Sequence, residues 1–226
     1  MADVSSQSSS NSVSRPTSSG SQIESKTPFS QPWRSSNLVL VVEGREFHVH
    51  RDVLIVCSPV FEAMLSSNFK EKSAIEIPLP EKKADEIEQL LQAIYPDREL
   101  SITKDNCFCL LTLSFEYQID LLKARCEIYI CTWCTKDMTK DEAIEVIVLS
   151  QKYPLNDKTV LGCITRFVSQ ELSWENLKKH TLFSELEPEN AQRLIEERVK
   201  YLERSKESVR IRLEAEIDAL RYGDDW

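Results

Sequence analysis

Glycine is scarce in this sequence. Only four glycines occur among 226 residues, at Gly20, Gly44, Gly162 and Gly223. A loop that cradles a phosphate or a dinucleotide needs several glycines close together, because its backbone must approach the ligand closely. Since the four glycines are dispersed along the chain, we expect no nucleotide-dependent chemistry.

Histidine is also scarce, with only His48, His50 and His180 present. His48 and His50 are two residues apart in an expected strand, so they face the same side and could in principle bind a metal together. No neighbouring Asp or Cys completes a tetrahedral set of ligands. No arrangement of serine, histidine and acid for nucleophilic catalysis stands out either. The sequence therefore predicts a protein that is not an enzyme and holds no cofactor or metal.

Basic charge and long apolar runs are lacking as well. The formal net charge is -9, whereas a nucleic-acid-binding protein needs a concentrated basic face to neutralise phosphates. The apolar runs are far shorter than the ~20 residues of a membrane helix, and the first residues are polar where a signal peptide has an apolar core. We expect no nucleic-acid or membrane partner, and a cytoplasmic or nuclear location or both.

Cysteine is present seven times, an odd number, in segments that are expected to be regular structure rather than loops. Such thiols are typically reduced and buried. Cys131 and Cys134 form a CxxC pair, and Cys107 and Cys109 form a CxC pair, so a four-cysteine zinc site is one alternative. Their spacing is not that of a zinc ribbon or finger, and the CxxC lacks the strand-then-helix setting of a thioredoxin-like motif. We favour structural thiols.

Serine is abundant at the start of the chain. Residues 1–36 contain fourteen serines and three prolines. This composition cannot bury enough apolar surface to offset the entropy of ordering, so it predicts a disordered tail. Thr27-Pro28 is a candidate phosphorylation site, and a solvated linker is the alternative interpretation.

The segment that follows has the clearest pattern. Apolar residues at 38–42 and alternating residues at 45–49 flank Glu43-Gly44, which suits a tight hairpin turn. The period then becomes helical, and Ser58-Pro59 is typical of an N-cap followed by proline at the first helical position. Further elements are expected as a strand, a helix, an edge strand and two more helices, at 74–79, 87–94, 99–102, 107–115 and 121–130.

The residues themselves, VEGREFHVHRDVL followed by SPVFEAML, together with this order of elements, resemble a BTB/POZ domain over residues 37–133. The resemblance implies an α+β fold, in which a cluster of helices flanks a short β-sheet. It also implies an interaction module rather than an enzyme. In this family a histidine at the position of His50 makes structural hydrogen bonds.

The second half of the chain contains an internal repeat. Residues 113–117 (LSFEY) are echoed by 149–153 (LSQKY), and Cys126 by Cys163, at an offset of 36 to 37. Stacked helical hairpins are the simplest way to bury the apolar faces of such units. The segment 139–188 is similar to the 3-box or BACK region of BTB adaptors, so we expect an all-α helical extension.

A charged helix is predicted over residues 189–222. Its apolar stripe advances in steps of three and four and is interrupted by Lys206 and Glu216. The helix either packs on its own protein or pairs with another chain as a coiled coil. The stripe consists of Ile195, Val199, Leu202, Val209, Leu213 and Leu220.

The resemblance also implies interaction sites. BTB adaptors that bind cullin-3 carry an apolar residue and a glutamate two positions later in one loop, which here are Phe69 and Glu71. A loop-borne aromatic makes a natural hot spot; alternatively, Phe69 packs on its own domain.

Homodimerisation is the other property that the resemblance implies. It would use the first helices, although the same residues could be only core. The family generally has an aspartate where this chain has Asn37, while the basic partner is kept as Arg51; loss of this charge pair argues against a groove for corepressor peptides. The expected dimer residues are Val53, Leu54, Val56, Cys57 and Phe61.

These features together predict a non-enzymatic adaptor. It would homodimerise, dock a cullin-3 ubiquitin ligase and present an unknown substrate protein for ubiquitination. The alternative is an oligomerisation scaffold, or a nuclear or transcriptional cofactor, that does not bind a cullin.

Overall fold

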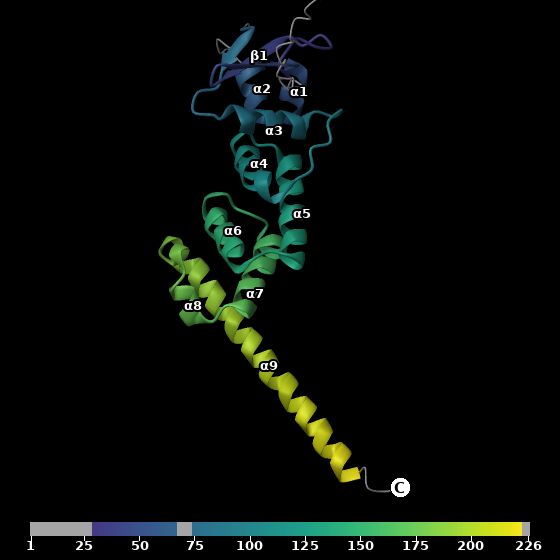
Figure 1. The fold of residues 1–226 in the computed structure, drawn as a ribbon, viewed down its shortest axis with the longest axis vertical. Helices are drawn as coiled ribbons and strands as arrows, with labels where there is room; N and C mark the ends of the chain where they lie inside the picture. The colour runs from purple at the N-terminus through teal and green to yellow at the C-terminus, as the bar shows by residue number, and fades with distance from the viewer. Residues whose placement is uncertain (1–28, 67–73, 223–226) are drawn as a thin grey trace, which may run out of the picture.

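The computed structural model describes residues 29–66 and 74–222. The molecule is elongated (Figure 1): the sheet and the first helices lie at one end, pairs of helices form the middle, and the last helix projects from the other end. The described part is therefore a stack of layers rather than a sphere.

The sheet has the strand order β2-β1-β3. β1 (Leu38–Val42) pairs antiparallel with β2 (Arg45–Val49), and β3 (Glu76–Pro78) joins β1 in parallel. Both turn residues, Glu43 and Gly44, have positive φ, as the predicted tight hairpin requires. Glutamate is strained in this conformation, and its carboxylate accepts a 2.8 Å hydrogen bond from the N–H of Ala84, which fixes the turn against the next helix.

Two short helices and a longer one follow the hairpin and pack below the sheet (Figure 1). The corner between the first two is organised by Ser58, which is fully buried. Its Oγ accepts a hydrogen bond from the N–H of Phe61 and donates one of 2.5 Å to the carbonyl of Tyr117. Phe61 also stacks on Tyr117, with ring centroids 4.6 Å apart. The helices are α1 (Arg51–Cys57), α2 (Pro59–Ser66) and α3 (Ala84–Ile94).

Two helical hairpins form the middle of the molecule, at the positions of the repeat that the sequence predicts. Ser114 and Ser150 occupy equivalent buried positions, and each hydroxyl donates to the carbonyl three residues earlier, at 2.7 and 2.6 Å. A short π-helical turn precedes the last of the four helices. The pairs are α4 (Lys104–Glu116) with α5 (Asp120–Lys136), and α6 (Lys140–Lys152) with α7 (Gly162–Glu171).

The end of the chain turns through α8 (Trp174–Lys178) and a 3₁₀ turn at Thr181–Glu185 into α9 (Pro188–Tyr222). Leu194, near the start of α9, is buried against the hairpins. The structure is thus α+β at the sheet end and all-α beyond it, which confirms the predicted fold class.

The structure differs from the prediction of one tail over residues 1–36. Phe29 is fully buried, and its carbonyl accepts a 2.8 Å hydrogen bond from the N–H of His48. The indole of Trp33 donates to the carbonyl of His48 at 2.9 Å, and both aromatic rings contact Tyr95. Two aromatic side chains therefore anchor residues 29–36 to the domain, although their neighbours are polar.

The expected edge strand at 99–102 is also absent from the described residues. The guanidinium of Arg125 donates hydrogen bonds of 2.7 Å to the carbonyls of Ala93 and Leu100. The side chain of Arg125 thus satisfies a backbone acceptor, the carbonyl of Leu100, in the segment that we expected to pair with a neighbouring strand.

Replacing Ser58 tests the importance of the α1–α2 corner. We expect Ser58→Ala to lower the free energy of unfolding by about 1 to 3 kcal/mol, because a buried carbonyl and a backbone N–H both lose their partner. Ser208→Ala is the matched control, since that hydroxyl is exposed on α9 and bonds only within its own helix; its effect should stay within about 0.5 kcal/mol. Urea unfolding followed by circular dichroism measures both. Equal stabilities of the two variants would contradict the role given to Ser58.

Candidate protein-interaction surfaces

The exposed face of α1 is the first candidate surface. Val56 is 84% exposed, and Val53 and Cys57 are partly exposed. Leu54 and Phe61, which we also expected at a dimer interface, are buried in the core of this chain. Of the five predicted dimer residues, only Val53, Val56 and Cys57 are therefore accessible to a partner in this structure.

An apolar recess of about 440 Å³ lies beside Val56, between α1, α3 and α5. Leu121, at its rim, is 76% exposed. Leu121 was not among the surface residues that we predicted. The adjacent pair Leu121-Leu122 at the start of a helix did indicate an exposed leucine, because only one of two successive side chains can face the core. The recess extends the apolar surface of α1 onto α5.

Asn37 and Arg51 lie together where β1 begins and α1 starts. The side-chain oxygen of Asn37 accepts a 2.8 Å hydrogen bond from the N–H of Arg51. The guanidinium of Arg51 donates to the carbonyl of Ala74 at 2.7 Å and to that of Leu65 at 3.5 Å. Leu65 and Ala74 flank residues 67–73 on either side. Arg51 thus bridges the two ends of the segment that contains the cullin-type triplet.

The triplet itself lies outside the described residues. Phe69 and Glu71 both fall within 67–73. Their predicted role in cullin binding stays a prediction.

The histidines are held by other groups of the chain rather than gathered at one site. His50 has Nδ1 3.2 Å from the hydroxyl of Tyr95 and Nε2 2.8 Å from the carbonyl of Arg34. His48 Nε2 lies 3.8 Å from a carboxylate oxygen of Glu46. Within the ranges that the structure describes, no three His, Cys, Asp or Glu side chains are placed to hold a metal ion.

The cysteines pair in space differently from their pairing in sequence. The thiol of Cys134 lies 3.8 Å from that of Cys163 on α7. The thiol of Cys107 on α4 interacts with that of Cys126 on α5, which together with burial raises the pKa of Cys107. Burial raises the pKa of Cys134 to about 12 and that of Cys109 to about 11. Thiols with such pKa values stay protonated at neutral pH and are poor nucleophiles. The CxxC and CxC spacings therefore bring no four-cysteine site together.

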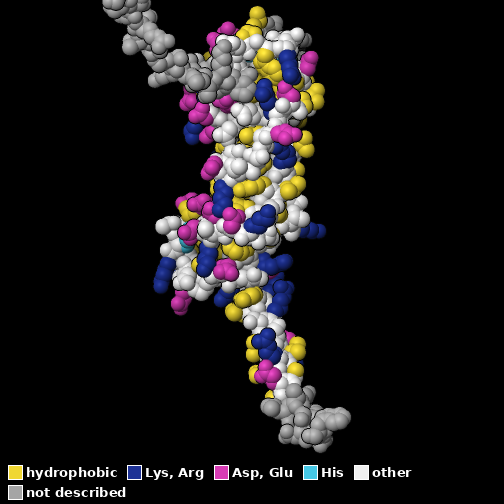
Figure 2. Space-filling view, turned by 45° about the vertical axis from the view of Figure 1, so that its right-hand side comes forward, with side chains coloured by type: hydrophobic (Ala, Val, Ile, Leu, Met, Phe, Trp, Pro, Cys, Tyr) yellow, Lys and Arg dark blue, Asp and Glu magenta, His cyan; other side chains and the backbone are white. Residues whose placement is uncertain are grey.

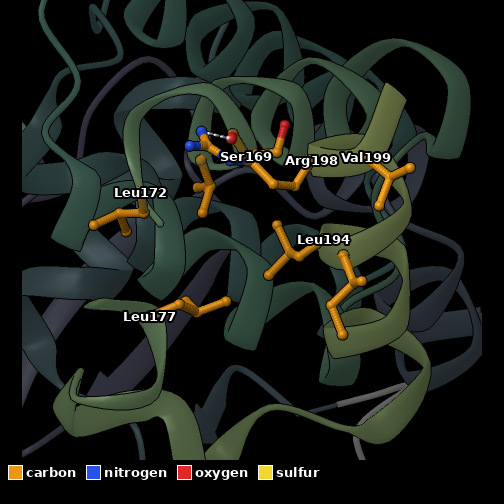
Figure 3. A pocket seen from close by; sticks show the side chains of 8 residues that line it. Ser169, Leu172, Leu177, Leu194, Arg198 and Val199 are labelled. Carbon is orange, nitrogen blue, oxygen red and sulfur yellow. Dashed lines mark hydrogen bonds between the residues drawn. The ribbon is translucent and has the colours of Figure 1, made fainter. Parts of the chain in front are cut away.

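A second apolar cavity, of about 270 Å³, lies between α7, α8 and the start of α9. Figure 3 shows Leu172, Leu177 and Leu194 around it. Arg198 crosses one side and donates a 2.6 Å hydrogen bond to the carbonyl of Ser169. This bond fixes the beginning of α9 on α7, so the cavity marks the point where α9 leaves the body of the protein.

Beyond that point, hydrophobic and charged side chains are interspersed along the projecting part of α9 (Figure 2). None of the helices within residues 29–66 and 74–222 combines the length and the apolarity that crossing a bilayer requires.

Comparison with known proteins gives a consistent result. The family model for the BTB/POZ domain, which is a protein-interaction module, matches residues 27–133. The chain is 35% identical over 91 residues to BTB and MATH domain-containing protein 38 of Caenorhabditis elegans, covering 40% of this chain and 23% of the relative. It is 29% identical over 176 residues to BTB and MATH domain-containing protein 36 of the same organism, covering 77% and 52%. Human Kelch-like protein 7 is 33% identical over 90 residues, covering 40% and 15%.

The chain thus spans between 15% and 52% of the lengths of these three relatives. The matched residues contain the sheet, α1 to α4 and most of α5, and they begin before Phe29, in agreement with its burial. Residues 27–133 of this chain are therefore a BTB/POZ domain, and a helical extension lies behind it.

Proposed function

We propose that this protein is a non-enzymatic adaptor that homodimerises through the α1 face and docks a cullin-3 ubiquitin ligase through residues 67–73. The observation that carries the proposal is the position of Arg51. Its guanidinium ties the carbonyls of Leu65 and Ala74, so the two ends of the triplet segment are fixed on the same domain that presents the α1 face. A substrate protein of unknown identity would be brought by the rest of the assembly, in the cytoplasm, the nucleus or both.

The exposed apolar side chains support dimerisation. Val56 and Leu121 are large, mostly exposed and flank one recess. An apolar patch that stays in water adds no stability to a monomer, whereas a two-fold interface buries the same patch on both subunits at once. Val53 and Cys57 lie on the same short helix and would be covered with it.

The triplet supports cullin binding through its chemistry. An aromatic side chain on a loop buries a large area on binding and loses little rotamer entropy, while a nearby carboxylate can orient the contact. Phe69 and Glu71 supply these two groups. The BACK-like interpretation of residues 139–188 adds a helical surface behind the domain that a long partner could also contact.

The alternative function is an oligomerisation scaffold or nuclear cofactor without cullin binding. Asn37 bears on this choice, because it binds the N–H of Arg51 through a neutral amide and provides no carboxylate to pair with its guanidinium. This arrangement weakens the version in which a charged pocket binds corepressor peptides, and it leaves the adaptor as the preferred function.

Co-purification of the full chain with cullin-3 tests the adaptor function. We expect the wild type to bind, and Phe69→Ala and Glu71→Ala each to weaken binding by at least tenfold, as truncation of a hot spot does. Lys70→Ala is the matched control and should bind like the wild type. A wild type that does not bind would refute the adaptor function, and two variants that bind normally would refute the motif assignment.

The role of Arg51 can be tested separately. We expect Arg51→Lys to weaken cullin-3 binding severalfold and to lower the free energy of unfolding by about 1 kcal/mol, because one ammonium group does not reproduce the planar fork that reaches two carbonyls. Binding is measured at a temperature where circular dichroism shows both proteins folded. Arg34→Lys, at an exposed ion pair with Asp97, should change neither quantity. Unchanged cullin affinity in Arg51→Lys would show that the loop does not depend on this anchor.

A charged side chain introduced on the exposed face of α1 tests dimerisation through this helix. We expect Val56→Glu to abolish association through α1 and so to lower the mass measured by light scattering coupled to size exclusion, without loss of helix content, because this side chain is exposed in the isolated chain and would carry a charge into the interface. Ile128→Glu, at an exposed position further along α5, should keep the mass of the wild type. A Val56→Glu variant that keeps the mass of the wild type would place this interface elsewhere.

A further inference from the structure

The projecting part of α9 lacks a partner within the described chain. Every side chain from Tyr201 to Ile217 is exposed, and Figure 1 shows this part of the helix extending away from the body. Most of the stability of a helix in a protein comes from packing of its apolar face, which this segment lacks. Ion pairs within the helix, such as those of Arg210 with Glu207 and Glu214, add about 0.3 to 0.5 kcal/mol each. These contributions are small for a segment of this length.

An apolar stripe runs along this segment. Leu202, Val209 and Leu213 are 50%, 55% and 52% exposed, and their spacing of seven and four places them on one face of the helix. The heptad seam that they define also contains Lys206 and Glu216. From Leu202 to Glu216 the seam is about 21 Å long at 1.5 Å per residue, which is enough for a helical partner of similar length.

The two charged seam residues indicate which partner fits and in which direction. In a parallel pair of identical helices, Lys206 would face Lys206 of the partner subunit, and Glu216 would face Glu216 of the partner subunit. Both contacts set like charges against each other in a partly desolvated seam, which is destabilising.

An antiparallel pair reverses this result. In the register in which Lys206 faces Glu216 of the partner subunit, Glu216 faces Lys206 of the partner subunit by symmetry. The same register sets Val209 against Leu213 of the partner subunit, twice. Both charges are therefore matched and the central apolar residues face each other, so the stripe is complementary to itself only when the second helix runs the opposite way.

We propose that α9 binds α9 of a second copy of this chain as an antiparallel pair, centred near Ile211 and held in register by Lys206 and Glu216. The contact has two-fold symmetry. It goes beyond the proposed adaptor function and is separate from the α1 face, because the two surfaces lie at opposite ends of the molecule (Figure 1).

The arginines near the centre of the pair do not overturn this register. Arg210 is held by Glu207 at 3.2 Å and by Glu214 at 3.4 Å on its own helix, so its charge is largely balanced before pairing. Arg212 lies at the edge of the seam, where water and salt screen its repulsion from the same residue of the partner.

Charge reversal at the seam tests the proposal. We expect K206E and E216K each to raise the dissociation constant of the α9 contact at least tenfold, because each variant sets like charges against each other twice. The double variant K206E/E216K should return to within about threefold of the wild type, since both pairs are restored with their signs exchanged. R204E is the matched control, because Arg204 points to the opposite side of the helix from the seam, and it should match the wild type.

Sedimentation equilibrium of the full chain is the measurement, made with the natural sequence and in the Val56→Glu background. In that background we expect a monomer–dimer equilibrium that responds to the seam variants, so the test does not depend on dimerisation through α1. Equal constants for the wild type, both single variants and the double variant would exclude the antiparallel register. A Val56→Glu protein that is monomeric at all concentrations would exclude pairing of α9 altogether, and would leave the α1 interface and the cullin contact unaffected.

Discussion

Two antiparallel helices cannot bury their apolar faces by themselves, and this constraint organises the molecule beyond the sheet. α4 and α5 pack on each other, α6 and α7 form the next pair, and α7 covers the beginning of α9. Ile130 and Ile164, from successive hairpins, are fully buried as a result. After Val199 no further layer follows among the described residues, and the apolar side of α9 is left in water. The apolar stripe of α9 is thus exposed because no further helical layer covers it within the described residues.

The elements that short-range chemistry specifies could be predicted from the sequence. Glu43-Gly44 predicted a hairpin because a tight turn needs residues that tolerate positive φ, and Ser58-Pro59 predicted a helix start because the serine hydroxyl caps a free N–H. Both are present. The repeat was visible because two hairpins with the same packing problem use the same residues, including the buried serine of each.

Features that depend on distant parts of the chain could not be predicted in the same way. Phe29 and Trp33 lie among serines, prolines and glutamines, so their local composition indicates disorder; contact with Tyr95, more than sixty residues later, orders them. On α1, periodicity could not separate Leu54, which is buried, from Val56, which is exposed, because the difference depends on which face later helices cover. The bridge from Arg51 to Ala74 likewise joins residues that no motif connects.

The elongated shape of the molecule has a consequence for assembly. A rod with one symmetric contact at each end is bivalent, and two different two-fold axes on one rod either close into a ring of dihedral symmetry or continue as an open chain. In a closed ring each contact also raises the effective concentration for the other, so weak pairing at the tip of α9 would be strengthened by the contact at the opposite end. The distance between the sheet and the tip of α9 would then set the spacing at which such an assembly repeats.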